Sequence, residues 1–207
     1  LQGAWSSDVC SSDLAGNADI ATITLANKAE YCLRHGYSLI ADNRPYAEAV
    51  AATKTICDYL DVFEIVWCLD ADTIITDMRP RFERLSCLGP HMTACEEGIV
   101  HWNRVNCGST IWKDTPESRR LLGEITEKEA EWRGLPCGWQ TWVEGHASVT
   151  VAPLRAFNSC EWSHPAGAAG EAGSHWRPGD FVYHPNGVFP FSDRLDRLKK
   201  RLGDVQR

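Results

Sequence analysis

The feature that most limits how this chain folds is an apolar run that ends in two carboxylates. Residues 64–75 read Glu-Ile-Val-Trp-Cys-Leu-Asp-Ala-Asp-Thr-Ile-Ile, so that Asp70 and Asp72 stand one residue apart. A run rich in Val, Ile and Trp without Gly or Pro is typical of a strand that is buried on both faces of a sheet. Such a strand accommodates two acids only where it leaves the core, because burying an unpaired carboxylate is costly. The pattern therefore predicts that Asp70 and Asp72 lie at the carboxyl end of a strand, where open α/β sheets bind ligands.

The chemistry of this acid pair favours a divalent cation. Carboxylate oxygens are the ligands that Mg²⁺ and Mn²⁺ prefer, and a metal held by one or two acids keeps positions for water and substrate phosphates. The pair therefore predicts a metal–diphosphate site. The alternative is an ordinary junction between a strand and a turn, where Asp is common.

The segments around the acid pair alternate between strand and helix patterns. Upstream, helical apolar spacing over 19–35 is followed by Gly36 in a C-cap position, then by a strand pattern over 37–41 and a helix pattern over 46–60. Downstream, we expect strands at 92–96, 106–112, 147–160 and 181–184, and helices at 82–85, 115–133, within 134–145 and at 192–202. Such alternation with short links predicts an α/β fold with a mixed, mostly parallel sheet flanked by helices.

The first 14 residues do not fit this alternation. Ser6-Ser7-Asp8-Val9-Cys10 and Ser11-Ser12-Asp13-Leu14 form a direct repeat without a strand or helix period. We interpret residues 1–14 as a non-native or disordered tail, similar to a translated sequencing adapter. Residues 15–207 are then expected to form a single domain whose first strand is missing, and deletion of the tail is expected to change the melting temperature little.

Composition excludes several classes of protein. A net charge of −7 and a pI near 5.5 argue against a nucleic-acid partner, because such binders need clustered Lys and Arg. No apolar run approaches the length of a membrane span, and no signal peptide is recognisable. Nine cysteines without a Cys-x-x-Cys pair favour buried free thiols over zinc. Together these features predict a cytoplasmic protein without a membrane span.

Four segments of the chain resemble glycosyltransferases of the GT-A fold that use nucleotide sugars. They are most similar to family 34, the retaining α-galactosyl, α-mannosyl and α-xylosyl transferases. The first segment, around Leu69-Asp70-Ala71-Asp72-Thr73, resembles the Asp-x-Asp motif of the fold. The other three segments resemble motifs of family 34, and the segments occur along this chain in the order that the family has. The three are Asn27-Lys28-Ala29-Glu30-Tyr31-Cys32-Leu33-Arg34-His35-Gly36-Tyr37, Trp102-Asn103-Arg104-Val105-Asn106-Cys107-Gly108 and Gly179-Asp180-Phe181-Val182-Tyr183-His184. His184-Pro185-Asn186-Gly187 also resembles the His-x-x-Gly of family 8, another retaining group of this fold.

The resemblance implies a role for each matching residue. Asp72 and His184 would bind Mn²⁺ or Mg²⁺, and Asp70 would help to hold the metal and face the ribose or sugar of the donor. Gln140, in Gly138-Trp139-Gln140-Thr141, would lie near the reacting carbon. The remaining residues implied in binding the nucleoside-diphosphate sugar are Asn106, Gly108, Asp180 and Gly187.

The implied activity is a metal-dependent transfer of a hexose or pentose from a nucleoside-diphosphate donor to a hydroxyl of a glycan or other acceptor, with retention. An inverting enzyme would instead need a general base, for which Asp180, Glu144 and Asp114 are equal candidates. Two alternatives remain open at this point. One is a non-catalytic fragment that binds nucleotide sugars. The other is a phosphatase of the haloacid dehalogenase type, whose nucleophile motif also contains two acids but lies in the first strand.

For the acid pair itself, we expect that neutralising either carboxylate leaves the metal-free fold intact. Like charges held close together disfavour each other's ionised form, so that removal of one charge relieves repulsion.

Overall fold

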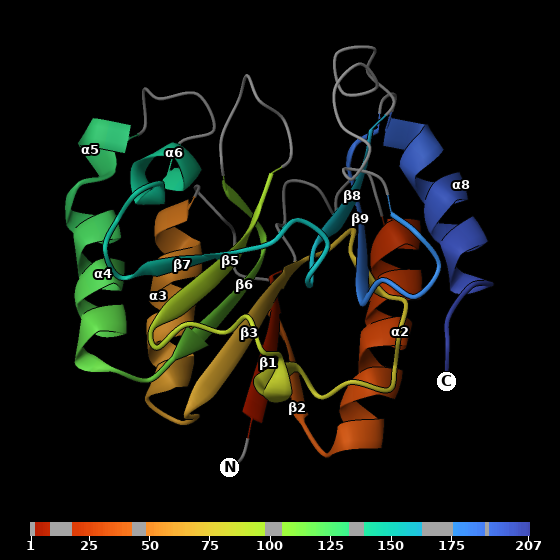
Figure 1. Cartoon of the computed structure of the whole chain (residues 1–207), viewed down its shortest axis with the longest axis horizontal. Helices are drawn as coiled ribbons and strands as arrows, with labels where there is room; N and C mark the ends of the chain where they lie inside the picture. Colours follow the sequence, from red (N-terminus) through yellow and green to blue (C-terminus); the bar gives the residue numbers. More distant parts are fainter. Residues whose placement is uncertain are drawn as a thin grey trace.

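The chain forms two β-sheets that are packed among helices (Figure 1). This computed structural model describes residues 3–8, 18–42, 49–97, 105–132, 139–162, 176–188 and 191–207. The strands are β1 (Gly3–Asp8), β2 (Ser38–Asp42), β3 (Ile65–Asp70), β4 (Ile74–Ile75), β5 (Met92–Glu96), β6 (Val105–Lys113), β7 (Val149–Ala152), β8 (Ser159–Trp162) and β9 (Val182–Gly187). The helices are α2 (Ala18–His35), α3 (Ala49–Leu60), the 3₁₀ turn η1 (Phe82–Arg84), α4 (Pro116–Glu127), α5 (Glu129–Trp132), α6 (Trp139–Val143) and α8 (Phe191–Leu202).

The larger sheet has six strands in the order β2-β1-β3-β6-β5-β7. Strands β2, β1 and β3 run parallel, β6 is antiparallel to both β3 and β5, and β7 is parallel to β5. The smaller sheet has the order β4-β9-β8, with β8 and β9 parallel. The prediction of a mixed, mostly parallel sheet flanked by helices is confirmed.

Strand β3 separates two apolar cores because its side chains alternate between the two faces of the sheet. Trp67 and Leu69 contribute to the core that α2 covers, whereas Val66 and Cys68 contribute to the core that α3 and α4 cover. This arrangement explains why residues 65–69 read as a continuous apolar run: all of them are buried.

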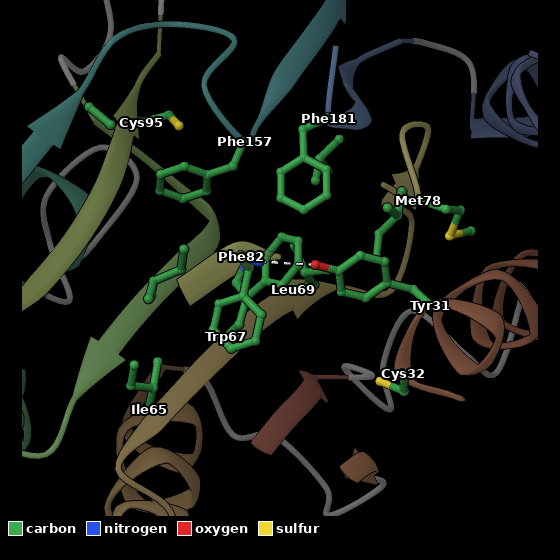
Figure 2. Close-up of a cluster of buried hydrophobic side chains, with 14 residues drawn as sticks. Tyr31, Cys32, Ile65, Trp67, Leu69, Met78, Phe82, Cys95, Phe157 and Phe181 are labelled. Atoms are coloured by element: carbon green, nitrogen blue, oxygen red, sulfur yellow. Dashed lines mark hydrogen bonds between the residues drawn. The ribbon is translucent and has the colours of Figure 1, made fainter. Parts of the chain in front are cut away.

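Tyr31 links α2 to the first of these cores. Its ring lies 5.9 Å from that of Trp67 and 5.8 Å from that of Phe181. Its hydroxyl donates to the Pro80 carbonyl and accepts a hydrogen bond from the Phe82 amide, as Figure 2 shows for Phe82. The buried polar atom is thus satisfied on both sides, and the loop after β4 is held against the sheet.

The expectation that the first strand is missing is wrong for residues 3–8. They form β1, which pairs with β2 from Ala4 to Asp8 and with β3 from Gly3 to Asp8. Ladder hydrogen bonds come from the backbone, which every non-proline residue supplies whatever its side chain. A segment without apolar alternation can therefore complete a sheet when strands on both sides present unpaired edges. The interpretation of residues 1–14 as a disordered tail fails for this strand, while the origin of the segment stays a prediction.

Most of the remaining boundaries agree with the sequence patterns. Gly36 follows α2 with φ of 74°, the left-handed conformation expected of a C-cap glycine. Thr115 caps α4 by accepting from the Ser118 amide, with Pro116 in the first turn. The expected single helix over 115–133 is wrong, because α4 ends at Glu127 and α5 begins only at Glu129. The expected helix start at residue 46 lies outside the described residues.

In the part of the chain that the structure describes, no helix combines the length and apolar character that a membrane crossing requires. The described cysteines are free thiols, as predicted.

Candidate metal centre

Asp70 and Asp72 lie at the carboxyl end of β3, as the apolar run predicts. Asp70 is the last residue of the strand, and the turn that follows leads into β4. The two carboxylates have different environments: the Asp70 side chain is 52% exposed, whereas that of Asp72 is 11% exposed. Asp70 therefore faces the solvent side of the site, and Asp72 lies in its buried part.

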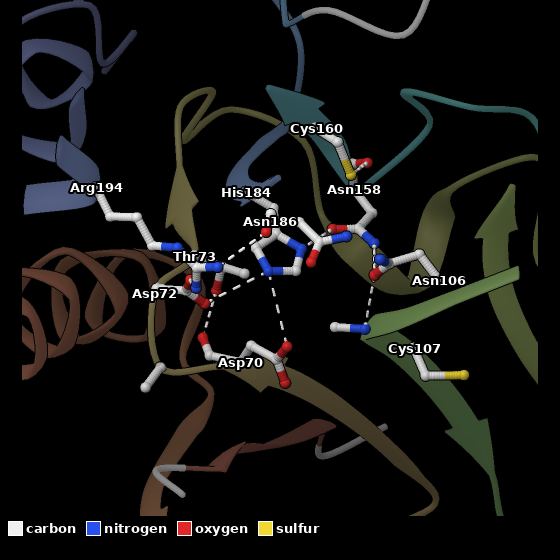
Figure 3. Close-up of polar contacts among 12 residues, drawn as sticks. Asp70, Asp72, Thr73, Asn106, Cys107, Asn158, Cys160, His184, Asn186 and Arg194 are labelled. Atoms are coloured by element: carbon white, nitrogen blue, oxygen red, sulfur yellow. Dashed lines mark hydrogen bonds and ion pairs between the residues drawn. The ribbon is translucent and has the colours of Figure 1, made fainter. Parts of the chain in front are cut away.

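His184, from the middle of β9, completes a group of three candidate ligands (Figure 3). Its Nε2 lies 3.7 Å from Asp70 Oδ2 and 3.4 Å from Asp72 Oδ1. One ligand atom from each residue lies within 4.8 Å of the others. The sequence prediction that Asp72 and His184 converge within metal-bridging reach is confirmed, although the residues stand more than a hundred positions apart in the chain.

Helix α2 holds the turn that carries the acids. The fully buried Lys28 donates from Nζ to the backbone carbonyls of Asp70 at 2.8 Å and Ala71 at 3.2 Å. One position earlier, Asn27 exchanges two hydrogen bonds with the backbone of Ile75. Burial lowers the pKa of Lys28 to about 8, against the opposing effect of the nearby acids. The Asn-Lys pair seen in the sequence thus clamps the turn through its backbone atoms.

Arg194 of α8 binds the second oxygen of Asp72. Its Nη1 lies 2.7 Å from Asp72 Oδ2, and its other nitrogens donate to the carbonyls of Asn186 and Val188. Burial opposes ionisation of Asp72, but His184, Arg194 and Lys28 together outweigh it and hold the pKa of this carboxyl well below its usual range. Asp72 is therefore a carboxylate with one oxygen on a guanidinium and the other facing His184.

The His184 ring is buried between acids. Burial alone would lower its pKa, but the carboxylates of Asp72, Asp70 and Glu97 outweigh this effect and raise the pKa of His184 above its ordinary value. A divalent cation at the same place would replace the ring proton as the positive charge, because a coordinating imidazole must be neutral.

Gly108, on β6, leaves space for the ligand side chains. A Cβ atom at this position would lie 2.3 Å from His184 Cε1 and 2.7 Å from Asp70 Oδ2. Both distances are shorter than any real Cβ contact, so that an alanine here would displace the ring or the carboxylate. The glycine is required by the ligands themselves, in addition to any role in a sugar pocket.

Two further predicted site residues lie beside Gly108. The Asn106 side chain accepts a hydrogen bond from the Gly108 amide at 2.8 Å. The Gln140 side chain, from α6, accepts one from the Cys107 amide at 2.8 Å. The structure therefore brings Asn106, Gly108 and Gln140 together on and against β6.

Asp180 and Gly187 flank His184 along the chain but have other neighbours. The Asp180 carboxylate receives two hydrogen bonds from the Arg155 side chain, one of them at 2.9 Å, and a third from the Arg177 amide at 2.9 Å. Gly187 is the last residue of β9 and is paired with Trp162 of β8. These contacts give Asp180 a part in holding the turn before β9, and its predicted role in donor binding stays a prediction.

Asp114 lies at the opposite end of the strands from the acid pair. Its amide donates to the Glu64 carbonyl, directly before the start of β3, and its carboxylate binds Arg119. The five residues of β3 between there and Asp70 span about 17 Å at 3.3 Å per residue. Asp114 is thus too far away to act as a base at this centre.

Sequence reasoning missed four residues that surround the ligands. They are Lys28, Arg194, Glu97 and Asn158. Glu97 directly follows β5, is 5% exposed and accepts a hydrogen bond from Asn186 at 2.9 Å; burial raises its pKa to about 7. An acid after an apolar strand is the same signal that identified Asp70, so that Glu97 was detectable from the sequence. No local pattern distinguishes Arg194 or Asn158, which reach the site through tertiary packing.

The side chains present fit a hard or borderline divalent cation. Two carboxylate oxygens and one imidazole nitrogen form a plausible ligand set for Mn²⁺. Because the Asp70 side chain is half-exposed, the group is open to solvent on that side. The side chains of His184 and Asp70 come together against Gly108, in a space that a Cβ atom at this position would fill.

Comparison with known proteins gives similarity in structure alone. No protein-family model matches this chain, and no curated protein matches it in sequence. The structure is similar to that of a glycosyltransferase involved in the glycosylation of the major capsid of PBCV-1, with a TM-score of 0.73 and 14% identity over 97% of this chain and 100% of the other.

Two further similarities point to the same fold. The galactosyltransferase LgtC in complex with donor and acceptor sugar analogs gives a TM-score of 0.56 with 15% identity, over 100% of this chain and 97% of its own. Mouse xyloside xylosyltransferase 1 gives 0.54 with 12% identity, over 92% and 99%.

The chain therefore has the GT-A fold of glycosyltransferases, as its sequence motifs implied. The phosphatase alternative expected the acids on the first strand along the chain, whereas Asp70 ends the third strand along the chain, β3, and Asp72 follows it.

Proposed function

We propose that this protein is a metal-dependent glycosyltransferase that moves a sugar from a nucleoside-diphosphate donor to a hydroxyl acceptor. The observation that carries the proposal is the convergence of Asp70, Asp72 and His184 at one edge of a GT-A fold. Two carboxylates and an imidazole around one point suit a cation that also binds phosphate oxygens.

Asp70, Asp72 Oδ1 and His184 Nε2 would hold Mn²⁺ or Mg²⁺. When bound, such a cation stabilises the negative charge that develops on the leaving diphosphate. The second oxygen of Asp72 stays on Arg194, which keeps the carboxylate from rotating. The exposed side of Asp70 is the direction from which the donor is expected to approach.

The donor pocket is proposed from the sequence motifs together with their grouping on β6. Asn106 and Gly108 would border the sugar, and Gln140 would lie near the reacting carbon. Asp180 and Gly187 remain proposed donor-binding residues on the strength of the resemblance. Retention is proposed on the same basis. A cytoplasmic location and the absence of a nucleic-acid partner stay predictions from composition.

An inverting reaction would need a carboxylate near the acceptor. The Asp180 carboxylate is occupied by Arg155, and Asp114 lies at the other end of the strands. Glu97, which directly follows β5, is buried, accepts a hydrogen bond from Asn186 and interacts electrostatically with His184, so that it is a further candidate. The anomeric configuration of the product decides between the two outcomes.

The test is an assay of nucleotide-sugar hydrolysis, in which release of the nucleoside diphosphate is measured for a panel of donors. We expect turnover with Mn²⁺, little with EDTA, and loss of turnover in Asp72→Asn. Thr53→Val is the matched control, because Thr53 bonds Thr126 between α3 and α4, away from the ligands. Binding of a donor without turnover, in the presence of acceptors of several classes, would favour the non-catalytic alternative. No binding of any donor or metal would refute the proposal.

A further inference from the structure

The orientation of the His184 ring is set by a chain of hydrogen bonds that starts at a backbone amide. The Gly108 amide donates to Asn106 Oδ1 at 2.8 Å. Asn158 Nδ2 donates to the same oxygen at 2.6 Å. Asn158 Oδ1 then lies 3.0 Å from His184 Nδ1 (Figure 3). Two strands, β6 and β9, and the segment before β8 are connected in this way.

The direction of every bond in this chain follows from its first member. A backbone N–H is only a donor, so the Asn106 atom that faces Gly108 must be the amide oxygen. The Asn158 atom that faces this oxygen must therefore be the amide nitrogen. This leaves the Asn158 oxygen on the side of His184, where it accepts but cannot donate.

The orientation of Asn106 has independent support from the opposite side of its amide group. The Asn106 side chain also interacts with the Glu97 carboxyl, which can only accept a hydrogen bond when it is ionised and then faces the amide nitrogen. The oxygen of Asn106 is thereby directed toward Gly108 and Asn158. Asn158 and Asn106 are 0% and 3% exposed, so that water does not compete for these bonds.

The consequence for His184 is a defined protonation site. Nδ1 faces an acceptor and must carry a proton. In the neutral ring Nε2 then holds the lone pair, and Nε2 is the atom that faces Asp70 and Asp72. A coordinating histidine whose other ring nitrogen donates to a fixed oxygen has its tautomer and ring plane set in advance.

We infer that Asn158 is a positioning residue that presents His184 Nε2 to the cation, and that it couples this ligand to the Asn106–Gly108 segment of the donor pocket. The inference rests on the proposed function for the existence of a bound cation. The inference also gives Asn106 a structural role. Its side-chain oxygen already accepts two hydrogen bonds from the protein and is therefore unavailable to a sugar hydroxyl. Asn158 touches neither metal nor donor and acts only through His184.

The two hydrogen bonds of Asn158 can be separated by substitution. Asn158→Leu has a similar size and removes both. Asn158→Asp keeps an acceptor for the Nδ1 proton and loses the donor to Asn106. Thr53→Val is again the control, because it removes a part-buried hydrogen bond between Thr53 of α3 and Thr126 of α4.

The readout is Mn²⁺ affinity of the apoprotein, measured by electron paramagnetic resonance. We expect Asn158→Leu to weaken binding by about 10- to 100-fold, the usual effect of losing the partner of a ligating histidine. We expect Asn158→Asp to bind close to wild type despite a lower melting temperature, and Thr53→Val to lose stability without losing affinity. Wild-type affinity in Asn158→Leu, or equal losses in the two Asn158 variants, would overturn the inference.

A second readout decides the tautomer without any metal or variant of Asn158. Ring-nitrogen NMR of histidine-labelled wild-type protein at alkaline pH, with His184 assigned from the His184→Gln variant, should show the proton on Nδ1. A proton on Nε2 would refute the inference even if Mn²⁺ binds. If the wild type binds no Mn²⁺, the proposed function fails, while the NMR result still decides whether Asn158 sets the ring.

Discussion

Asp72→Asn should destabilise the metal-free protein much more than Asp70→Asn. From the sequence, both substitutions were expected to be harmless, because two neighbouring carboxylates repel each other. The structure alters this expectation for Asp72, whose carboxylate lies 2.7 Å from the Arg194 guanidinium and also interacts with Lys28. Neutralising Asp72 removes a carboxylate that faces His184, the Arg194 guanidinium and the buried Lys28 ammonium.

The magnitude follows from burial. Removing one partner of a buried ion pair costs about 3–5 kcal/mol, and the Asp72 and Arg194 side chains are only 11% and 13% exposed. Because Asn keeps one acceptor oxygen for Arg194, we expect the lower end, about 3 kcal/mol. The Asp70 side chain is 52% exposed, and pairs of this kind contribute about 0–1 kcal/mol.

Urea unfolding in EDTA at pH 7 measures both free energies. For a chain of this length, about 3 kcal/mol corresponds to a fall of about 6–12 °C in melting temperature. The wild-type advantage over Asp72→Asn is fully present above the unfolded carboxyl pKa of about 3.9 and shrinks as the pH falls below it, because the folded pKa is depressed.

The control is the double variant Asp72→Asn/Arg194→Met. Replacing the Arg194 guanidinium as well should recover part of the loss, and the double-mutant cycle then gives the coupling between the two side chains. Equal unfolding free energies for Asp70→Asn and Asp72→Asn, within error, would show that the cations do not stabilise Asp72 and that the repulsion argument was correct.

Three further experiments test other parts of the structure. Gly108→Ala should weaken Mn²⁺ binding at least about tenfold by displacing His184, whereas Gly123→Ala, in α4 with open space around it, should stabilise the fold by about 0.5–1 kcal/mol; equal metal affinity in the two variants would contradict the crowding argument. Glu97→Gln should leave the unfolding free energy unchanged near pH 4 and raise it by up to about 3 kcal/mol at pH 8. The reason is that folding raises the pKa of Glu97 from 4.5 to about 7, so that the wild-type fold loses stability as the pH rises through this window. A difference between variant and wild type that does not change with pH would refute this. Deletion of residues 1–8 should unfold the domain, because β1 lies between β2 and β3 and is paired with both. Circular dichroism of the shortened chain is the measurement, and a spectrum like that of the full chain would contradict the prediction.

Local patterns predicted the elements that carry the site. The apolar run at 65–69 placed Asp70 at the end of a buried strand, because burial on both faces leaves no other place for a polar side chain. The run at 181–183 likewise predicted a strand that ends at His184, but β9 continues to Gly187 and His184 lies within it. Caps such as Thr115 and Gly36 were visible for the same reason: each depends on bonds within a few residues.

Pairing between strands was not visible in the sequence. The antiparallel insertion of β6 between β3 and β5, and the position of β1 between β2 and β3, are decided by backbone edges that no side-chain pattern encodes. An absence of apolar alternation in residues 3–8 therefore misled the prediction.

The amino-acid sequence by itself indicated the α/β class and the three candidate ligand side chains, since each of them ends or interrupts an apolar run that is readable in a short window. Only the tertiary structure decided the surroundings of those ligands. Lys28, Arg194 and Asn158 come from segments distant in the chain, and each contributes a charge or a hydrogen bond whose direction depends on where α2, α8 and the segment before β8 pack. Electrostatic and hydrogen-bond partners act over a few ångströms in space, and spacing along the chain carries no information about such distances.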